Sequence, residues 1–299
     1  MTDGPERGTS VRDATADFEG FLRVDGSPLH VLVEGTGPVV VLSAGLGLGW
    51  FDWDPVAALL APDHTVVRFD RPGHGRSGPV TAPPTLAGEA DRIAGVLDAL
   101  GPRAAGPATV VGHSLAGPHA EGFARRHPAR TAALVLVDSS VEAEPPAPRT
   151  PPALRTALAR AAGAGLTALA LPLLLGPALR RAGVRAARVD GVDTAPRAAV
   201  RRCYGTGRVW TGTLLANARY PETLAELARL RETHPLTAPT TVLGAYDGSG
   251  RRRELDWLGL QAHLADLLGA RFEVATPAGH LVQADRPRQV AHAIRQARG

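Results

Sequence analysis

The residues most able to do chemistry lie around Ser114, where an apolar run ends and a helix-forming segment begins. A strand-to-helix turn of this kind is sharp enough to strain the serine backbone and to hold the hydroxyl clear of the sheet edge. The residues two before and two after such a serine nearly touch, so both must be small. Here they are Gly112 and Ala116. The pattern predicts a nucleophilic serine for acyl transfer, and the alternative is a tight turn whose serine has no chemical role.

A serine hydroxyl is a weak nucleophile at neutral pH, so it needs a base and an acid that orients the base. In open parallel sheets such residues gather at the carboxyl ends of strands. Asp247, just past an expected strand, and His280, in the loop after the last one, follow Ser114 in the order Ser, Asp, His. We therefore expect His280 to take the serine proton and Asp247 to orient His280. Asp138 also follows a strand and is a rival for the acid; otherwise it would cap a helix or stabilise a loop.

Alternating strand and helix patterns surround these residues. Apolar runs rich in β-branched residues, such as 39–43, fit strands that are buried on both faces of a sheet. Apolar residues recur mostly every three or four positions from 85 to 100, which fits a helix. Such alternation predicts an α/β fold, in which helices cover both faces of a mostly parallel central sheet.

The alternation stops in the middle of the chain. Residues 141–235 begin with a proline-rich segment and continue with Ala-, Leu- and Arg-rich helical patterns, without a convincing strand. We expect this all-helical insertion to act as a lid, because it lies near the strand ends that carry the serine. The expected domains are a loose tail at 1–20, an α/β core at 21–140 and 236–299, and the insertion at 141–235.

Composition excludes several classes of function. The chain is 44% hydrophobic and 21% charged, as in ordinary globular proteins. It contains no lysine, so all 33 basic residues are arginine, which accounts for a pI of about 10.1. Aromatic residues make up only 4% and are not interleaved with basic runs, which argues against a nucleic-acid partner. The single cysteine, Cys203, excludes an intrachain disulfide, and no cluster has metal-ligand spacing, so we expect no metal.

The sequence also bears on location. Residues 1–17 are polar and charged without an apolar core, so we expect no secretory signal and a cytoplasmic protein. The most apolar stretch, residues 166–179, is interrupted by two prolines and a glycine and is too short to span a bilayer. We therefore expect no stable membrane insertion.

Five matches in the correct order make the chain resemble the α/β-hydrolase superfamily over about residues 20–298. The matches are Gly-His-Ser-Leu-Ala at 112–116, Asp-Arg-Pro-Gly-His-Gly-Arg-Ser at 70–77, the strand ending at Asp138, the strand and acid turn from Pro239 to Asp247, and the Gly279-His280 turn before a helix. The resemblance implies the serine-nucleophile branch with a helical lid and no cofactor. It favours Asp247 over Asp138, because the turn around Asp247 matches the family's usual acid position.

The resemblance also implies an oxyanion hole made of two backbone N–H groups. One would belong to Leu115, directly after the nucleophile, and the other to Leu46, in a glycine-rich loop at 43–50 that lets the backbone approach a substrate closely. The superfamily often has His-Gly where this chain has Ala44-Gly45. The sequence indicates no residues for substrate binding.

These observations predict a cofactor-free serine hydrolase that acts on a small to medium ester, thioester or related acyl bond. A carbon–carbon bond hydrolase or an aminopeptidase of the same fold is an alternative. From a different class, the chain could be a binding protein that kept the fold and lost turnover. A serine at the strand-to-helix turn, position 114, argues against the dehalogenase and epoxide-hydrolase branches of the superfamily, which use aspartate at that position.

The insertion is rich in arginine: residues 141–234 contain fourteen arginines and seven acidic residues. One hypothesis is that these arginines attract an anionic or acyl-carrier-linked substrate. The alternative is that they are solvated side chains lying over apolar helices. Leucines between 166 and 175 fit either an apolar acyl pocket or plain packing between helices.

Overall fold

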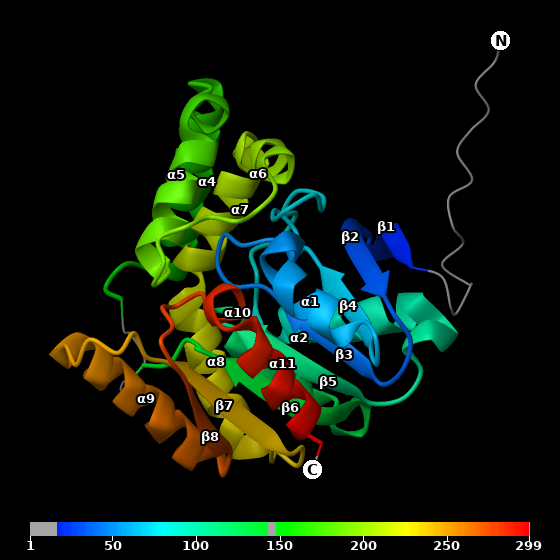
Figure 1. Cartoon of the computed structure of the whole chain (residues 1–299). Coiled ribbons are helices and arrows are strands. Elements are labelled where there is room, and N and C mark those ends of the chain that lie inside the picture. Colours follow the sequence, from blue (N-terminus) through cyan, green and yellow to red (C-terminus); the bar gives the residue numbers. More distant parts are fainter. Residues whose placement is uncertain (1–16, 143–147, 299) are drawn as a thin grey trace.

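The computed structural model describes residues 17–142 and 148–298 (Figure 1). Most of the tail expected at residues 1–20 lies outside the described residues. Its last three residues do not belong to a tail, because the first strand already begins at Phe18 and pairs with the second strand.

An eight-stranded sheet forms the centre of the molecule. Its strands are β1 (Phe18–Val24), β2 (Ser27–Glu34), β3 (Val39–Ser43), β4 (Thr65–Phe69), β5 (Ala108–His113), β6 (Thr131–Val137), β7 (Thr240–Ala245) and β8 (Arg271–Ala275). They lie in the order β1-β2-β4-β3-β5-β6-β7-β8. Strand β2 pairs antiparallel with β1 and β4, and every other pairing is parallel. The expected mostly parallel α/β fold is confirmed.

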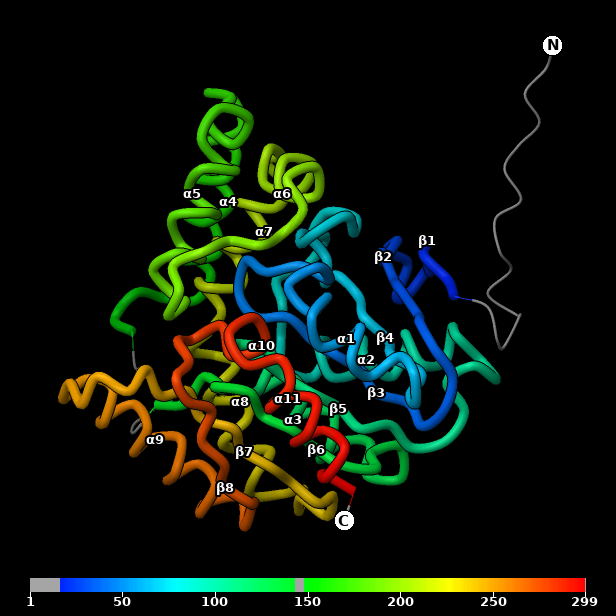
Figure 2. Tube along the Cα trace, in the orientation of Figure 1, coloured from blue at the N-terminus to red at the C-terminus, as the bar shows by residue number. Residues whose placement is uncertain are grey.

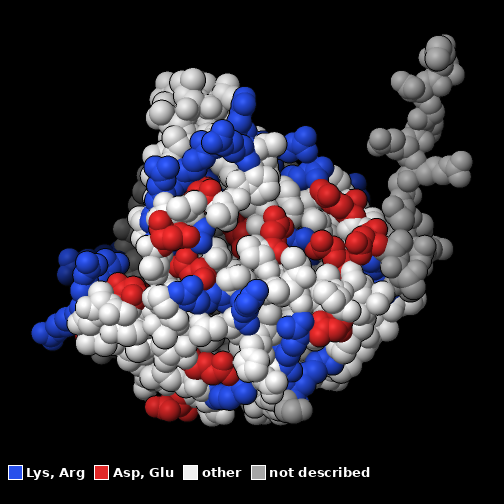
Figure 3. Space-filling model, viewed as in Figure 1, with Lys and Arg blue, Asp and Glu red and all other residues white. Residues whose placement is uncertain are grey.

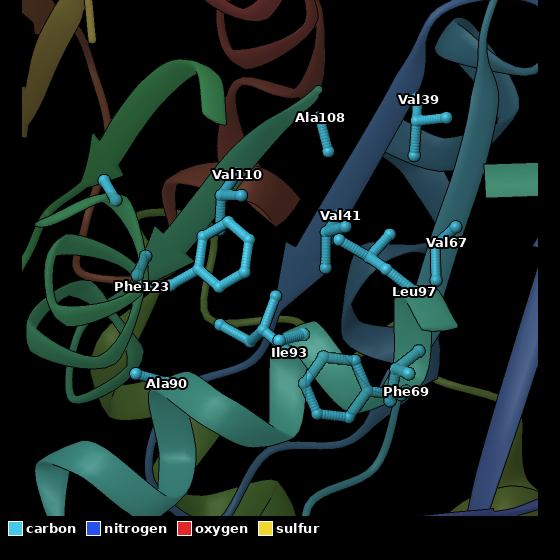
Figure 4. Close-up of a cluster of buried hydrophobic side chains, with 14 of the residues drawn as sticks. Val39, Val41, Val67, Phe69, Ala90, Ile93, Leu97, Ala108, Val110 and Phe123 are labelled. Carbon is cyan, nitrogen blue, oxygen red and sulfur yellow. The ribbon is translucent and has the colours of Figure 1, made fainter. Parts of the chain in front are cut away.

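Helices cover both faces of the sheet, because the central strands are apolar on both sides. In β3, Val39 and Val41 face one buried cluster, while Val40 and Leu42 face the other. Figure 4 shows the first cluster, in which Ile93 and Phe123 pack against the valines of β3 and β5. Each face is therefore closed by a layer of side chains that alternate along the strands.

The helices of the first face are α2 (Leu86–Leu100), α3 (Ala116–Arg126) and α9 (Arg252–Leu268), and those of the second are α1 (Asp54–Leu60), α10 (Val282–Asp285) and α11 (Pro287–Gln296). Short 3₁₀ turns lie at Trp50–Trp53 (η1), Gly101–Ala104 (η2) and Pro128–Arg130 (η3). Helix α2 begins where the Thr85 hydroxyl accepts a hydrogen bond from the Gly88 N–H at 3.0 Å. It ends at Gly101, whose φ of 59° suits glycine.

Between β6 and β7 the described residues form five helices: α4 (Pro152–Ala168), α5 (Leu171–Ala187), α6 (Arg197–Tyr204), α7 (Gly207–Ala218) and α8 (Tyr220–Thr233). Helices α4 and α5 form a hairpin that projects away from the sheet, while α6 and α7 lie beside it (Figures 1 and 2). Helix α8 instead packs against α2 and α3. The last helix of the insertion therefore belongs to a covering layer of the sheet, and only the first four stand above it.

No helix in the described part of the chain is long and apolar enough by itself to cross a bilayer. The pair α4 and α5 passes that test of length and composition only when joined across a bend of 108°.

Candidate active site

Ser114 occupies the sharp turn that its neighbours predicted. It lies between β5 and α3 with φ at 52°, in the left-handed region that few residues other than glycine adopt. A Cβ atom on Gly112 would lie 2.4 Å from the carbonyl oxygen of Ala116, so the position two before the serine admits only glycine. The start of α3 follows directly, and the positive end of its helix dipole favours negative charge beside the serine.

Three side chains form a hydrogen-bonded relay at the carboxyl ends of β5, β6 and β8. The Ser114 Oγ lies 2.9 Å from His280 Nε2, and the His280 Nδ1 lies 2.6 Å from Asp138 Oδ2. With the Nδ1 proton donated to the carboxylate, Nε2 is the free acceptor for the serine proton. The structure therefore brings Ser114 and His280 together as expected, with Asp138 as their third member.

The Asp138 carboxylate is buried, with only 1% of its side chain exposed. Its second oxygen, Oδ1, accepts hydrogen bonds from the Trp257 Nε1–H at 2.8 Å and from the Ala245 N–H at 2.9 Å. A buried carboxylate is costly unless its oxygens are satisfied, and here both are. Donors from α9 and from the end of β7 thus fix the carboxylate that faces His280.

The prediction that Asp247 orients His280 is wrong. The Asp247 Oδ1 accepts a hydrogen bond from the Ser249 N–H at 2.8 Å, closing a local turn, and hydrogen bonding to Ser249 lowers the pKa of Asp247. The reason is the order of strands. Strand β6 lies next to β5, so the residue directly after β6 is close to Ser114, whereas Asp247 lies beyond the next strand.

His113 supports the relay through the backbone. Its Nε2–H donates to the carbonyl oxygen of His280 at 2.8 Å, which ties the histidine loop to the end of β5. Burial lowers the pKa of His113 to about 3, helped by the nearby His280 ring, so the imidazole is neutral near pH 7. His113 is therefore a fixed donor that anchors the loop carrying His280.

The glycine-rich loop at 43–50 passes directly over the serine. A Cβ atom on Gly45 would lie 3.0 Å from the Ser114 Cβ. Two long-range donors hold the carbonyl groups of this loop: Arg71 Nη2 donates to the Gly45 oxygen at 2.9 Å, and the Tyr204 hydroxyl donates to the Gly47 oxygen at 2.5 Å. Sequence reasoning missed both donors, because their partners lie far away in the chain and no local pattern marks them.

The two N–H groups expected to hold an oxyanion belong to Leu46, in that loop, and to Leu115, at the start of α3. Within residues 17–142 and 148–298, neither N–H donates a hydrogen bond to another protein group. Leu46 lines the same cavity as Ser114. Both groups are thus free to donate to a ligand atom beside the serine.

A cavity of about 240 Å³ opens onto Ser114 and His280 between the core and the insertion. Its walls are mainly apolar and include Leu48, Leu179, Val184, Val209 and Trp210. None of the leucines from 166 to 175 lines it, so the suggestion that these leucines form an acyl pocket is not what the structure shows. The apolar wall comes instead from the second half of α5 and from α7.

A buried charge cluster beside this cavity joins the insertion to the core. The Arg180 guanidinium of α5 contacts the Asp52 carboxylate of η1, lies 3.8 Å from Asp193, and stacks over the rings of Phe51 and Tyr204 at 5.8 and 5.4 Å. Burial raises the pKa of Asp52 to about 6, although Arg180 opposes the shift. Sequence reasoning missed this cluster, because its members come from distant segments.

Other reactive groups lie outside the relay. Burial raises the pKa of the Cys203 thiol to about 12, so it is not a thiolate near neutral pH. In the part of the chain that the structure describes, no three His, Cys, Asp or Glu side chains gather as a metal ion would require.

Comparisons with known proteins bear on the family and the fold of the chain. A family model described as "Alpha/beta hydrolase family" matches residues 39–293. A protein of Azorhizobium caulinodans named "Putative carbamate hydrolase RutD" is 34% identical over 116 residues, which cover 39% of this chain and 43% of that relative. This chain therefore spans less than half the length of that relative.

Solved structures resemble the whole chain. Cfl2 from Burkholderia cenocepacia is 23% identical with a TM-score of 0.72, covering 95% of this chain and 96% of that one. A thermophilic esterase from Thermogutta terrifontis is 22% identical with a TM-score of 0.66, covering 93% and 97%. At these identities the likeness shows the fold alone.

Proposed function

Because the chain belongs to the alpha/beta hydrolase family, we propose that it is a serine hydrolase that cleaves an ester, thioester or related acyl bond. The observation that carries this proposal is the hydrogen-bonded sequence from Ser114 through His280 to Asp138, at 2.9 and 2.6 Å. The name of the Azorhizobium relative, a carbamate hydrolase, also describes cleavage of an acyl bond.

In the first step the Ser114 Oγ attacks the acyl carbon while its proton passes to His280 Nε2. The Asp138 carboxylate holds the Nδ1 proton and stabilises the imidazolium that forms. Negative charge on the substrate oxygen would be held by the Leu46 and Leu115 N–H groups, with the start of α3 behind them. The collapse of this intermediate expels the leaving group, which takes the proton from His280.

In the second step water attacks the acyl-serine, and His280 serves first as base and then as acid. The free acid leaves, and Ser114 regains its proton. Each step needs one proton carrier and one fixed carboxylate, which the relay supplies.

The cavity at Ser114 favours one class of acyl group, and a second cavity of about 1030 Å³ also borders His280 and Asp138. The volume of about 240 Å³ and the apolar wall of the first cavity suit a short to medium acyl group without charge. Arg180 lines this first cavity but already contacts Asp52, with Asp193 nearby, so its charge is compensated within the protein. The charge inside the cavity therefore does not favour an acyl chain that carries an acid group. Attraction of anionic substrates by arginines on the surface of the insertion is a separate hypothesis.

A fluorophosphonate probe tests the proposal, because it reacts only with an activated serine. We expect labelling of the wild-type protein and none of Ser114→Ala, while Ser249→Ala, a matched change in the exposed turn after β7, labels normally. A wild-type protein that neither labels nor hydrolyses p-nitrophenyl esters of any chain length would contradict the proposal. That result would favour a binding protein that kept the fold.

A further inference from the structure

The tip of the α4–α5 hairpin exposes large apolar side chains to solvent. Leu169, Leu173 and Leu174 are 68%, 70% and 69% exposed, and Leu175 is also exposed. These residues form the bend between the helices and the first turn of α5. Figure 3 shows the tip as a white, uncharged knob projecting from the molecule. Clustered exposure of this kind marks a surface that meets an apolar partner, whereas single exposed leucines carry no such meaning.

All the charged side chains of the α4–α5 hairpin are positive. From Pro152 to Ala187 the chain has five arginines and no acidic residue. Two of the five are engaged: Arg155 contacts Glu222, and Arg180 contacts Asp52. The other three have no ion-pair partner among the described residues.

Helix α6, which packs against α5, adds three more arginines. Within the described parts of the chain, the unpaired set is Arg160, Arg181, Arg185, Arg197, Arg201 and Arg202, which we call the arginine band. The two acids between α5 and α6 do not pair with it, because Asp190 pairs with Arg188 and Asp193 lies against Arg180. In Figure 3 blue side chains lie below the white tip. The band thus presents positive charge to whatever the tip contacts.

The spacing along α5 fits one kind of partner. A helix rises 1.5 Å per residue, so Arg181 lies roughly 10 Å behind Leu174 along the axis. Helices that rest in a membrane surface bury their apolar side chains about 5–10 Å into the boundary between headgroups and acyl chains. With the leucines at that depth, Arg181 would lie level with the lipid phosphates and would bind them by charge, while Arg185, one turn farther from the tip, would lie on their solvent side.

We propose that the tip of the α4–α5 hairpin docks reversibly on an anionic lipid bilayer, with the leucines inserted and the arginine band on the phosphates. Farther along α5, Leu179 and Val184 contribute to the wall of the cavity beside Ser114. Docking would therefore hold α5, and with it this wall of the cavity, near the bilayer surface, where apolar acyl compounds collect. This contact is peripheral and requires no span across the membrane. It does not rest on the proposed hydrolase activity, since binding is measured without turnover.

Flotation of the purified protein with lipid vesicles tests this proposal. We expect the wild type to float with vesicles of equal parts phosphatidylglycerol and phosphatidylcholine, and to bind pure phosphatidylcholine at least about tenfold more weakly. The double variant Leu173→Ser/Leu174→Ser should lose affinity by about a hundredfold, because each of the two buried leucine side chains is worth about tenfold. The double variant Arg181→Gln/Arg185→Gln should lose affinity for the anionic vesicles. Added salt should likewise weaken the binding of the wild type to these vesicles, because it screens the charges.

Matched controls come from α9, on another part of the surface. Leu255→Ser and Leu267→Ser remove leucines that are also exposed, and Arg253→Gln removes an exposed arginine, so none should change flotation. Hydrolysis of a soluble short-chain ester should be equal in the wild type and the tip variants, since Leu173 and Leu174 do not line the cavity. Equal circular dichroism and melting temperature would show that the variants fold.

Three outcomes would overturn the proposal. The wild type could fail to float with either vesicle, or the tip variant could float as well as the wild type. Analytical ultracentrifugation could instead show a dimer that Leu173→Ser/Leu174→Ser dissociates and that does not bind vesicles, in which case the tip meets a second copy of the chain.

Discussion

Strands β6 and β7 are neighbours in the sheet, and each is followed closely by an aspartate, yet the two carboxylates have different surroundings. Asp138, directly after β6, is buried and receives hydrogen bonds from His280, Trp257 and Ala245. Asp247, two residues beyond β7, closes its own turn on Ser249. One carboxylate is held by segments from three parts of the chain, and the other is held locally.

The difference shows that the end of a strand is not by itself an active-site position. A carboxylate can orient His280 only if its strand lies within one interstrand spacing of the serine's strand, or if its loop turns back far enough. Strand β6 meets the first condition, because it pairs directly with β5. The residues around Asp138 then complete a buried site that keeps the charge in place.

Substitution of each of the two aspartates should give the largest difference in activity between the two regions. Asp138→Asn should lower kcat/KM by roughly 10³–10⁴-fold, because an amide beside Nδ1 no longer fixes the tautomer or stabilises the imidazolium. Asp247→Asn should leave kcat/KM within about twofold. Both are measured with a soluble p-nitrophenyl ester. Equal losses in the two variants, or a loss confined to Asp247→Asn, would reverse the assignment.

Acid titration of His113 extends the comparison to the end of β5. The pKa of His113 is lowered to about 3 in the folded protein, so between its ordinary 6.5 and that value the unfolded chain binds more protons. The free energy of unfolding should therefore fall as pH falls through this window, by up to about 1.4 kcal/mol per pH unit from this residue. Denaturant unfolding at several pH values measures the slope.

Substitution of His113 tests whether this residue causes part of the slope. His113→Gln, which keeps a donor for the His280 carbonyl, should make the slope shallower, although the buried His74 and His119 keep part of it. Equal slopes in the wild type and His113→Gln would show that His113 is not held neutral.

Removal of one hydrogen bond near each aspartate gives the smallest effect. Trp257→Phe deletes the 2.8 Å bond to Asp138 Oδ1 and leaves that of Ala245, so kcat should fall by about tenfold or less. The matched change is Tyr246→Phe, which removes the acceptor for the Gly250 N–H in the turn after β7 and should not alter kcat. An unchanged kcat in Trp257→Phe would mean that the indole does not help to fix the carboxylate.

Much of the fold and part of the site could be predicted from the sequence. Apolar runs indicated the buried strands, and the small residues around Ser114 predicted the sharp turn that the structure contains. His280 was placed beside the serine because it follows the last strand of a parallel sheet. These features depend on local patterns and on the general rule for strand ends.

The acid could not be chosen in the same way. Two aspartates follow neighbouring strands, and only the strand order and the donors from α9 and β7 decide between them. Arg71 and Tyr204, which hold the glycine-rich loop, bond to carbonyl groups 26 and 157 positions away, so no local pattern could indicate them.

The measurement that tests the relay most directly is the proton NMR signal of the His280 Nδ1–H, recorded where the imidazole is protonated. A proton shared with a buried carboxylate at 2.6 Å should resonate far downfield in the wild type and in Asp247→Asn, and that signal should disappear in Asp138→Asn and His280→Gln. A signal that survives in Asp138→Asn and disappears in Asp247→Asn would contradict the role of Asp138 as the acid of the relay.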